Sequence, residues 1–169
     1  TACGLMALEV HPLHKKQGAA LEMIRYFEDY ARRHGALLTL LLPFQISFYR
    51  RMGYGFAGKL YEYHLPTAVL PKPDGEARRH LRLLQPEDFD RVLACHSRFA
   101  AQNHGMVEKF EEEVRAARTD VQVRRIGYCA DDGTLRGYVA YRFESASDTN
   151  YTRNRLSVEE LVYDDGVVL

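Results

Sequence analysis

The sequence predicts an α/β fold in which helices flank a mixed β-sheet. In the first third of the chain, two apolar runs of strand length enclose an amphipathic helical segment. A proline-containing break follows, and after it come two more helical segments and a hairpin pattern. The 169 residues suffice for one domain or for two incomplete ones.

The first 43 residues predict a strand–helix–strand unit. Residues 2–10 are mostly apolar and precede a proline, as in a buried strand. Residues 18–35 repeat apolar side chains at helical spacing, carry basic residues in the last turn and end on Gly35. Residues 36–43 form a second apolar run. We expect the two strands to be parallel, because a helix connects them.

Two short elements and a linker are expected next. Residues 46–53 are long enough for about two helical turns. Residues 54–65 are rich in aromatic side chains and predict a strand. Three prolines between Pro66 and Pro73, followed by Asp74 and Gly75, predict a linker.

The second half predicts further strands and helices. Residues 80–84 are expected to form a strand, and a helix is expected from Pro86 to about Ala101. A charged helix is expected from Val107 to Arg118. A hairpin turning through residues 131–134 follows, and one more strand begins near Arg155.

Composition excludes several classes of function. The 23 basic and 23 acidic side chains balance, so no overall charge attracts nucleic acid or an anionic membrane. No apolar run approaches the roughly 18 residues that span a bilayer. Three separated cysteines suggest neither a disulfide framework nor a Cys-x-x-Cys metal site. We therefore expect a cytoplasmic protein without a metal.

The loop before the first helix is a candidate anion site. Lys15 and Lys16 bring positive charge, and Gly18, Ala19 and Ala20 keep the first turn slim. Backbone N–H groups and the helix dipole at such a junction favour a phosphate. The alternative is a basic loop that merely precedes a helix. This loop has neither the P-loop pattern nor the Gly-x-Gly-x-x-Gly pattern.

Two linked motifs resemble those of the Gcn5-related N-acetyltransferase (GNAT) superfamily. "KKQGAA", residues 15–20, is similar to its Arg/Gln-x-x-Gly-x-Gly/Ala loop, with lysine in the first position. "FYRRMGY", residues 48–54, is similar to its Phe-Tyr-x-x-x-Gly-Phe/Tyr signature. The chain most resembles the enhanced-intracellular-survival (Eis) type, in which two GNAT domains precede a sterol-carrier-like domain. The likeness covers residues 1–65 well and the remainder more weakly.

This resemblance implies a domain organisation of two partial GNAT domains in tandem. Residues 1–65 correspond to the C-terminal half of an acetyl-CoA-binding GNAT domain, and residues 66–77 to a linker. Residues 78–169 correspond to the N-terminal part of a second, degenerate GNAT-like domain. We therefore expect the chain to be a central fragment of a longer protein, and activity of the fragment alone is an open question.

The resemblance also implies a reaction, the transfer of acetyl from acetyl-CoA to an amine such as a small molecule, an aminoglycoside or a lysine. Tyr49 would act as general acid toward the departing thiolate, whereas the alternative is an aromatic residue in a packed corner. The remaining implied residues bind the cofactor. Leu8 and Val10 would pair with the pantetheine arm, Ser47 would contact that arm or cap a helix, and the diphosphate would lie on Lys15, Lys16, Gln17, Gly18, Ala19 and Ala20.

Several alternative hypotheses remain compatible with the sequence. Glu9 could hold a water as part of a base, but the sequence favours a carboxylate without that role. A noncatalytic CoA-binding or assembly module that keeps the GNAT fold is the main alternative function. A further alternative is that the two halves complete each other as one permuted domain. Homo-oligomeric assembly is an additional expectation.

Overall fold

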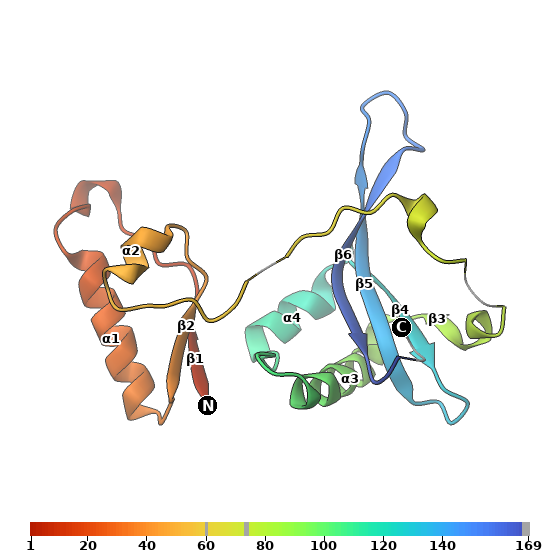
Figure 1. Ribbon diagram of the computed structural model, residues 1–169, viewed down its shortest axis with the longest axis horizontal. Coiled ribbons are helices and arrows are strands. Elements are labelled where there is room, and N and C mark those ends of the chain that lie inside the picture. The colour runs from red at the N-terminus through yellow and green to blue at the C-terminus, as the bar shows by residue number, and fades with distance from the viewer. Residues whose placement is uncertain (60, 73–74, 167–169) are drawn as a thin grey trace. The chain divides into compact units, whose positions relative to one another are not determined.

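The computed structural model describes residues 1–59, 61–72 and 75–166. The chain divides into two compact units, Thr1–Tyr61 and Glu62–Leu169 (Figure 1). Both units combine helices with strands, which confirms the predicted α/β class. Pro73 and Asp74 of the predicted linker lie outside the described residues.

Unit 1 is built around a parallel pair of strands. Its elements in chain order are β1 (Ala2–Leu5), the 3₁₀ helix η1 (Pro12–His14), α1 (Ala19–Arg33), β2 (Leu38–Leu41) and α2 (Ile46–Arg50). Ala2 lies opposite Leu38, and Leu5 lies opposite Leu41. The predicted parallel strand–helix–strand unit is therefore confirmed.

Helix α1 forms where the sequence predicts it. One face carries the buried side chains Ile24, Phe27 and Ala31, at intervals of three and four residues. Glu22 in the first turn and two arginines in the last turn have the signs that the helix dipole favours. Gly35 follows the helix at φ 71°, a left-handed conformation that glycine adopts without steric cost.

Two strand predictions in unit 1 need correction. The first strand ends at Leu5 rather than continuing to residue 10, and Ala7 has φ 56°, which an extended strand does not allow. Leu8 and Val10 consequently lie beyond β1. The strand predicted over residues 54–65 is wrong, since none of its described residues is in a strand. Phe56, Tyr61 and Tyr63 are exposed instead of packing on a neighbouring strand, and Tyr54 is half-buried.

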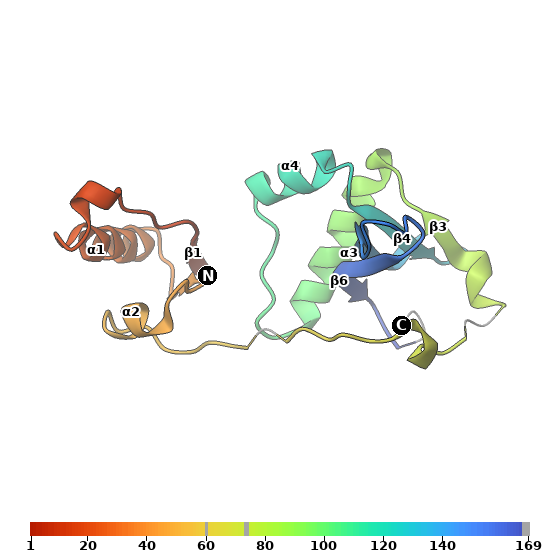
Figure 2. The ribbon, with the colours of Figure 1, turned by 90° about the horizontal axis from the view of Figure 1, so that it is seen from above.

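Unit 2 contains an antiparallel sheet in the order β3-β4-β5-β6. Two helices lie on the same side of this sheet (Figure 2). The strands are β3 (Leu81–Leu83), β4 (Arg124–Cys129), β5 (Leu135–Ser145) and β6 (Asn154–Tyr163), and the helices are α3 (Phe89–Gln102) and α4 (Glu111–Thr119). The 3₁₀ helices η2 (Thr67–Val69), η3 (Ala77–His80) and η4 (Pro86–Asp88) complete the unit.

The predicted elements of unit 2 are confirmed, with shifted boundaries: β3 is shorter than predicted, and α3 begins at Phe89, after η4, and not at Pro86. The β4–β5 hairpin turns at Gly133, which has φ 81°, and the Ala130 amide donates to the Thr134 carbonyl at 2.9 Å. Helix α4 starts at Glu111 and not at Val107. Three glutamates then fill its first turn, where the helix dipole favours negative charge.

The core of unit 2 joins α3 to the sheet. Its fully buried members come from α3, β5 and β6, and are Val92, Cys95, Leu135, Tyr138, Ala140 and Val162. Burial raises the pKa of the Cys95 thiol to about 11, so this thiol stays protonated. A Cβ at Gly127 on β4 would lie 2.5 Å from Leu135 Cδ1 and 2.9 Å from Leu84 Cδ2, so a larger residue there would have to displace these leucine side chains.

A buried polar cluster holds the chain at the start of α4 against the sheet. The Lys109 side chain is 8% exposed and donates to Glu160 of β6 and, at 2.9 Å, to Glu113 of α4. The Tyr138 hydroxyl donates to the other Glu160 oxygen at 2.9 Å. Burial opposes ionisation of Glu160, but the hydrogen bonds and the charge of Lys109 outweigh it and lower its pKa. Because α4 itself has no buried residue, polar contacts hold it in place.

Replacing Lys109 by methionine should destabilise unit 2 by about 3 kcal/mol, because it leaves two carboxylates without their buried partner. Arg115→Met is the matched control. It breaks the exposed Glu111–Arg115 pair and should cost less than about 1 kcal/mol. Denaturant unfolding of the two variants measures both values. Equal losses of unfolding free energy in the two variants would show that the Lys109 cluster stabilises unit 2 no more than an exposed ion pair does.

Acidification should weaken unit 2 through His96, which is 5% exposed. Burial is the main cause that lowers the pKa of His96. The charge of Lys109 lowers it further, whereas the charges of Glu160 and Glu113 raise it. The unfolded chain therefore binds a proton more readily, so stability falls as pH drops below about 6.5, the ordinary histidine value. His96→Gln should flatten the dependence of the unfolding free energy on pH between about 7.5 and 5.5.

His104→Gln provides the control for this prediction, since His104 is exposed and the substitution removes the same ionisable group. Its pH dependence should match that of the unmodified protein. An unchanged slope in His96→Gln would contradict the assignment.

Candidate active site

The two motifs singled out in the sequence lie at the same end of unit 1. Parallel strands β1 and β2 end at a common edge, and the loop that leads into α1 and the helix α2 both leave that edge (Figure 1). In α/β folds, ligands bind beyond the carboxyl ends of such strands. This end of unit 1 is therefore the candidate active site.

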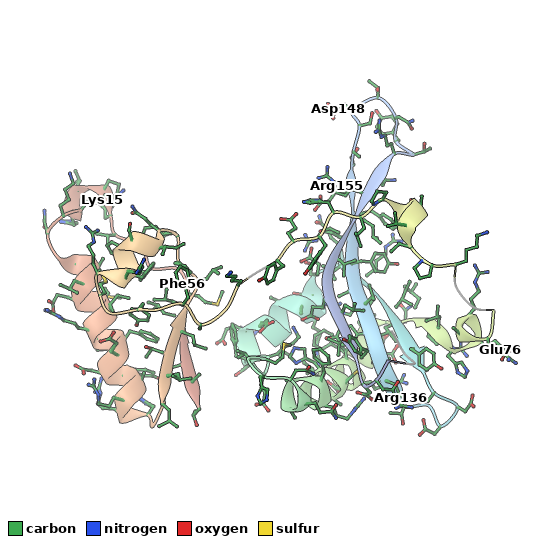
Figure 3. All side chains as sticks on the ribbon, in the orientation of Figure 1. Lys15, Phe56, Glu76, Arg136, Asp148 and Arg155 are labelled. Atoms are coloured by element: carbon green, nitrogen blue, oxygen red, sulfur yellow. The ribbon has the colours of Figure 1, made fainter. Side chains whose placement is uncertain are left out.

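The loop before α1 is exposed and internally hydrogen-bonded. His11 Nδ1 accepts from the Leu13 amide at 3.3 Å, which caps η1. Gln17 Nε2 donates to the Leu13 carbonyl at 3.2 Å. The side chains of Lys15 and Lys16 face solvent, and Lys15 lies at the outer edge of the unit (Figure 3). Both ammonium groups are available to an anion.

Gly18 gives this loop its backbone conformation. It is the N-cap residue of α1, at φ 87° and ψ −8°, and makes no side-chain capping bond. Lys16 is also left-handed, at φ 63°. A Cβ at Gly18 would meet nothing within 4 Å, so the requirement for glycine comes from the backbone angle and not from space. Without a capping side chain, the first amides of α1 can bind an external acceptor.

Tyr49 is the buried centre of an aromatic cluster on α2. It is 4% exposed, and its ring contacts Phe44, Phe48 and Tyr54 edge-on, with centroids 5.1 to 6.2 Å apart. The Met52 and Tyr54 amides donate to its carbonyl, at 2.9 and 3.2 Å. Gly53, at φ 94°, allows this tight turn. Burial raises the pKa of Tyr49, so its hydroxyl is protonated at neutral pH.

A pocket of about 560 Å³ opens beside Tyr49. Its volume lies within the range of small-molecule sites, and most of its lining is apolar. The lining residues come from the end of β2, from α2 and from the segment after Gly53, and are Thr39, Leu40, Leu41, Leu42, Pro43, Ile46, Tyr49, Arg50, Tyr54, Gly55, Phe56, Ala57, Gly58, Lys59 and Tyr61. Tyr49 is thus buried in a cluster and also borders a pocket.

The other residues proposed from the sequence lie outside this pocket lining. The loop residues 15–20 lie at the same end of unit 1 but do not border the pocket. Leu8 and Val10 are half-buried in the segment that follows β1. Ser47 is exposed in the first turn of α2, where Gln45 is the N-cap residue, so the helix-cap alternative for Ser47 is wrong.

Several residues that line the pocket were not predicted from the sequence. Arg50 and Tyr54 belong to the motif at residues 48–54 and Phe56 follows it, yet only Tyr49 was given a role there. The Tyr54 hydroxyl is buried and has no hydrogen-bond partner in the described part of the chain. Burial is the main cause that raises the pKa of Tyr54. Thr39 lowers this pKa, whereas the charge of Glu28 raises it. The repeated aromatic residues on both sides of Gly53 are the sequence feature that could have indicated a pocket lined by aromatic side chains.

The described residues contain neither a metal-binding cluster nor a membrane-spanning helix. No group of three or more His, Cys, Asp or Glu side chains there could hold a metal ion. None of the helices described is both long and apolar enough to cross a bilayer. Glu9, the carboxylate considered as part of a base, is exposed in the segment after β1.

Comparison with known proteins points to acetyltransferases. Residues 1–57 match the model of a family described as an acetyltransferase (GNAT) domain. A GCN5-related N-acetyltransferase from Kribbella flavida has a similar crystal structure, with a TM-score of 0.61 and 20% identity. The match covers 96% of this chain and 39% of that chain. No curated protein sequence matches.

Two further solved structures are more distant. An acetyltransferase from Trypanosoma brucei has a TM-score of 0.34 and 17% identity, over 50% of this chain and 58% of that chain. The N-myristoyltransferase of Saccharomyces cerevisiae with bound myristoyl-CoA has a TM-score of 0.45 and 14% identity, over 95% of this chain and 43% of that chain.

The chain spans less than two thirds of each of these structures. At 20% identity, the Kribbella flavida structure supports the fold alone. The family match supports an acetyltransferase signature in the segment that contains both Gly18 and Tyr49. Together these findings support a GNAT-like fold and an acetyltransferase (GNAT) domain over residues 1–57.

Proposed function

We propose that this protein takes part in the transfer of an acetyl group from acetyl-CoA to an amine. One observation carries the proposal. A buried phenol, Tyr49, borders a pocket at the same end of unit 1 as a glycine-capped, lysine-flanked helix start. A candidate anion site and a proton donor at one edge suit acyl transfer from a diphosphate-containing thioester.

The loop would hold the diphosphate of CoA. The amides of Gly18, Ala19 and Ala20 lie at the positive end of α1, and Lys15, Lys16 and Gln17 belong to the same exposed loop. Leu8, Val10 and Ser47 are proposed to contact the pantetheine arm. Holding the cofactor at several points would fix the thioester in place and contribute through orientation.

Tyr49 would then act as general acid. The amine attacks the thioester carbonyl carbon, the C–S bond breaks, and the leaving sulfur takes the phenolic proton while the amine loses a proton to solvent or to a base. A pKa raised by burial keeps the phenol protonated until that moment. The phenolate that remains regains its proton from water after the products leave.

The wider assignment extends this proposal. We propose an Eis-like arrangement, in which unit 1 represents the end of an acetyl-CoA-binding domain and unit 2 the start of a degenerate one. A cytoplasmic location fits an acetyl-CoA-dependent reaction and three free cysteines. A noncatalytic module that only binds CoA is the competing function, and turnover tests the difference.

Replacing Gly18 by valine should weaken binding of desulfo-CoA at least about tenfold, since a β-branched residue resists φ 87° and the loop would change shape. Titration calorimetry measures the affinity. Gly75→Val is the control, because a Cβ there meets nothing and Gly75 has no positive φ. Unchanged affinity in Gly18→Val would rule out this loop as the diphosphate site.

Replacing Tyr49 by phenylalanine should lower kcat about 10²-fold or more while leaving acetyl-CoA affinity within about twofold. The ring still fills the aromatic cluster, so only the proton donor is lost. Steady-state kinetics and calorimetry separate the two effects. Tyr26→Phe, at an exposed position of α1, should change neither. Full activity of Tyr49→Phe would exclude the acid role.

A further inference from the structure

The charged groups of the Tyr49 pocket all have one sign. Arg50 and Lys59 are the charged members among its described lining residues, and no Asp or Glu lines it. Both cations are exposed, Arg50 on α2 and Lys59 on the segment that follows Gly53. The described lining is therefore positive at Arg50 and Lys59, and Glu28, which interacts with the Tyr54 hydroxyl, lies outside it.

The rest of the lining is suited to an apolar body. Leucines from β2, together with Pro43 and Ile46, form one part, and the aromatic rings of Tyr49, Tyr54, Phe56 and Tyr61 form another. Phe56 is largely exposed, so its ring is accessible to a ligand (Figure 3). Aromatic faces attract an ammonium group, whereas Arg50 and Lys59 repel it, and this repulsion grows with each further ammonium group on the ligand.

We propose that the acceptor is a monoamine with an apolar or aromatic body, and that Arg50 and Lys59 exclude polycations such as polyamines and aminoglycosides. This inference rests on the proposed function and narrows its acceptor class. The single amino group lies near Tyr49, and the apolar body contacts the leucines and Phe56. Sites that select polycations place carboxylates around them, and this pocket lacks those groups in its described lining.

The test compares phenethylamine, a monoamine with an aromatic body, with spermidine, a flexible triamine. Ligand-observed NMR titration of the 169-residue protein gives the dissociation constant of each. Phenethylamine should bind at least about tenfold more tightly. Equal affinities, tighter binding of spermidine, or no binding of either amine would overturn the proposal.

Removing the charges of Arg50 and Lys59 provides a sharper test of the proposal. The double variant Arg50→Gln, Lys59→Gln should reduce the preference for phenethylamine by about tenfold, mainly through tighter spermidine binding. The control Arg51→Gln, Lys72→Gln removes the same charge at exposed positions outside the pocket lining and should keep the preference. An equal loss of preference in both double variants would show that total charge, and not the pocket, is responsible.

Phe56→Ala tests the apolar contact by itself. It should weaken phenethylamine about threefold or more and leave spermidine unchanged. Acetyl-CoA affinity, measured by calorimetry on the same samples, separates the two levels of proposal. Normal acetyl-CoA binding without the amine preference contradicts the acceptor class alone. Absence of acetyl-CoA binding contradicts the proposed function.

Discussion

The parallel pairing of β1 with β2 is the constraint on which the candidate site depends. Because α1 connects the two strands, their carboxyl ends fall at one edge of unit 1. The uncapped start of α1 and the aromatic cluster of α2 then leave that edge together. An antiparallel pairing would place one of these features at the opposite end, and no cofactor would link them in the way proposed.

Unit 2 is organised by different interactions. Its sheet is antiparallel, its core is apolar, and the start of α4 is attached through Lys109, Glu113 and Glu160. Arg118 adds an ion pair with Asp90 at 2.6 Å and lies over the ring of Phe89. These contacts support a structural role for Lys109, Glu113, Glu160 and Arg118 in unit 2.

Much of this architecture could be predicted from the sequence, because apolar periodicity and glycine positions report local conformation. Residues 18–35 fixed the bounds of α1, and the Asp-Gly turn indicated the β4–β5 hairpin. The strand expected over residues 54–65 was wrong, since aromatic residues form strands only when a neighbour pairs with them. Strand β1 ends early because Ala7 has φ 56°, and no pattern of side chains in the sequence predicts that backbone angle. The motifs located Tyr49 and Gly18, but the pocket itself arises from packing among β2, α2 and the following segment.

The most direct test of the central claim is an amide-resolved NMR titration of the protein with CoA. The account predicts that the amides of residues 17–20 and the ring signals of Tyr49 shift together, with a single dissociation constant, because one ligand spans both. Shifts confined to unit 2, or shifts at the loop with none at Tyr49, would contradict it.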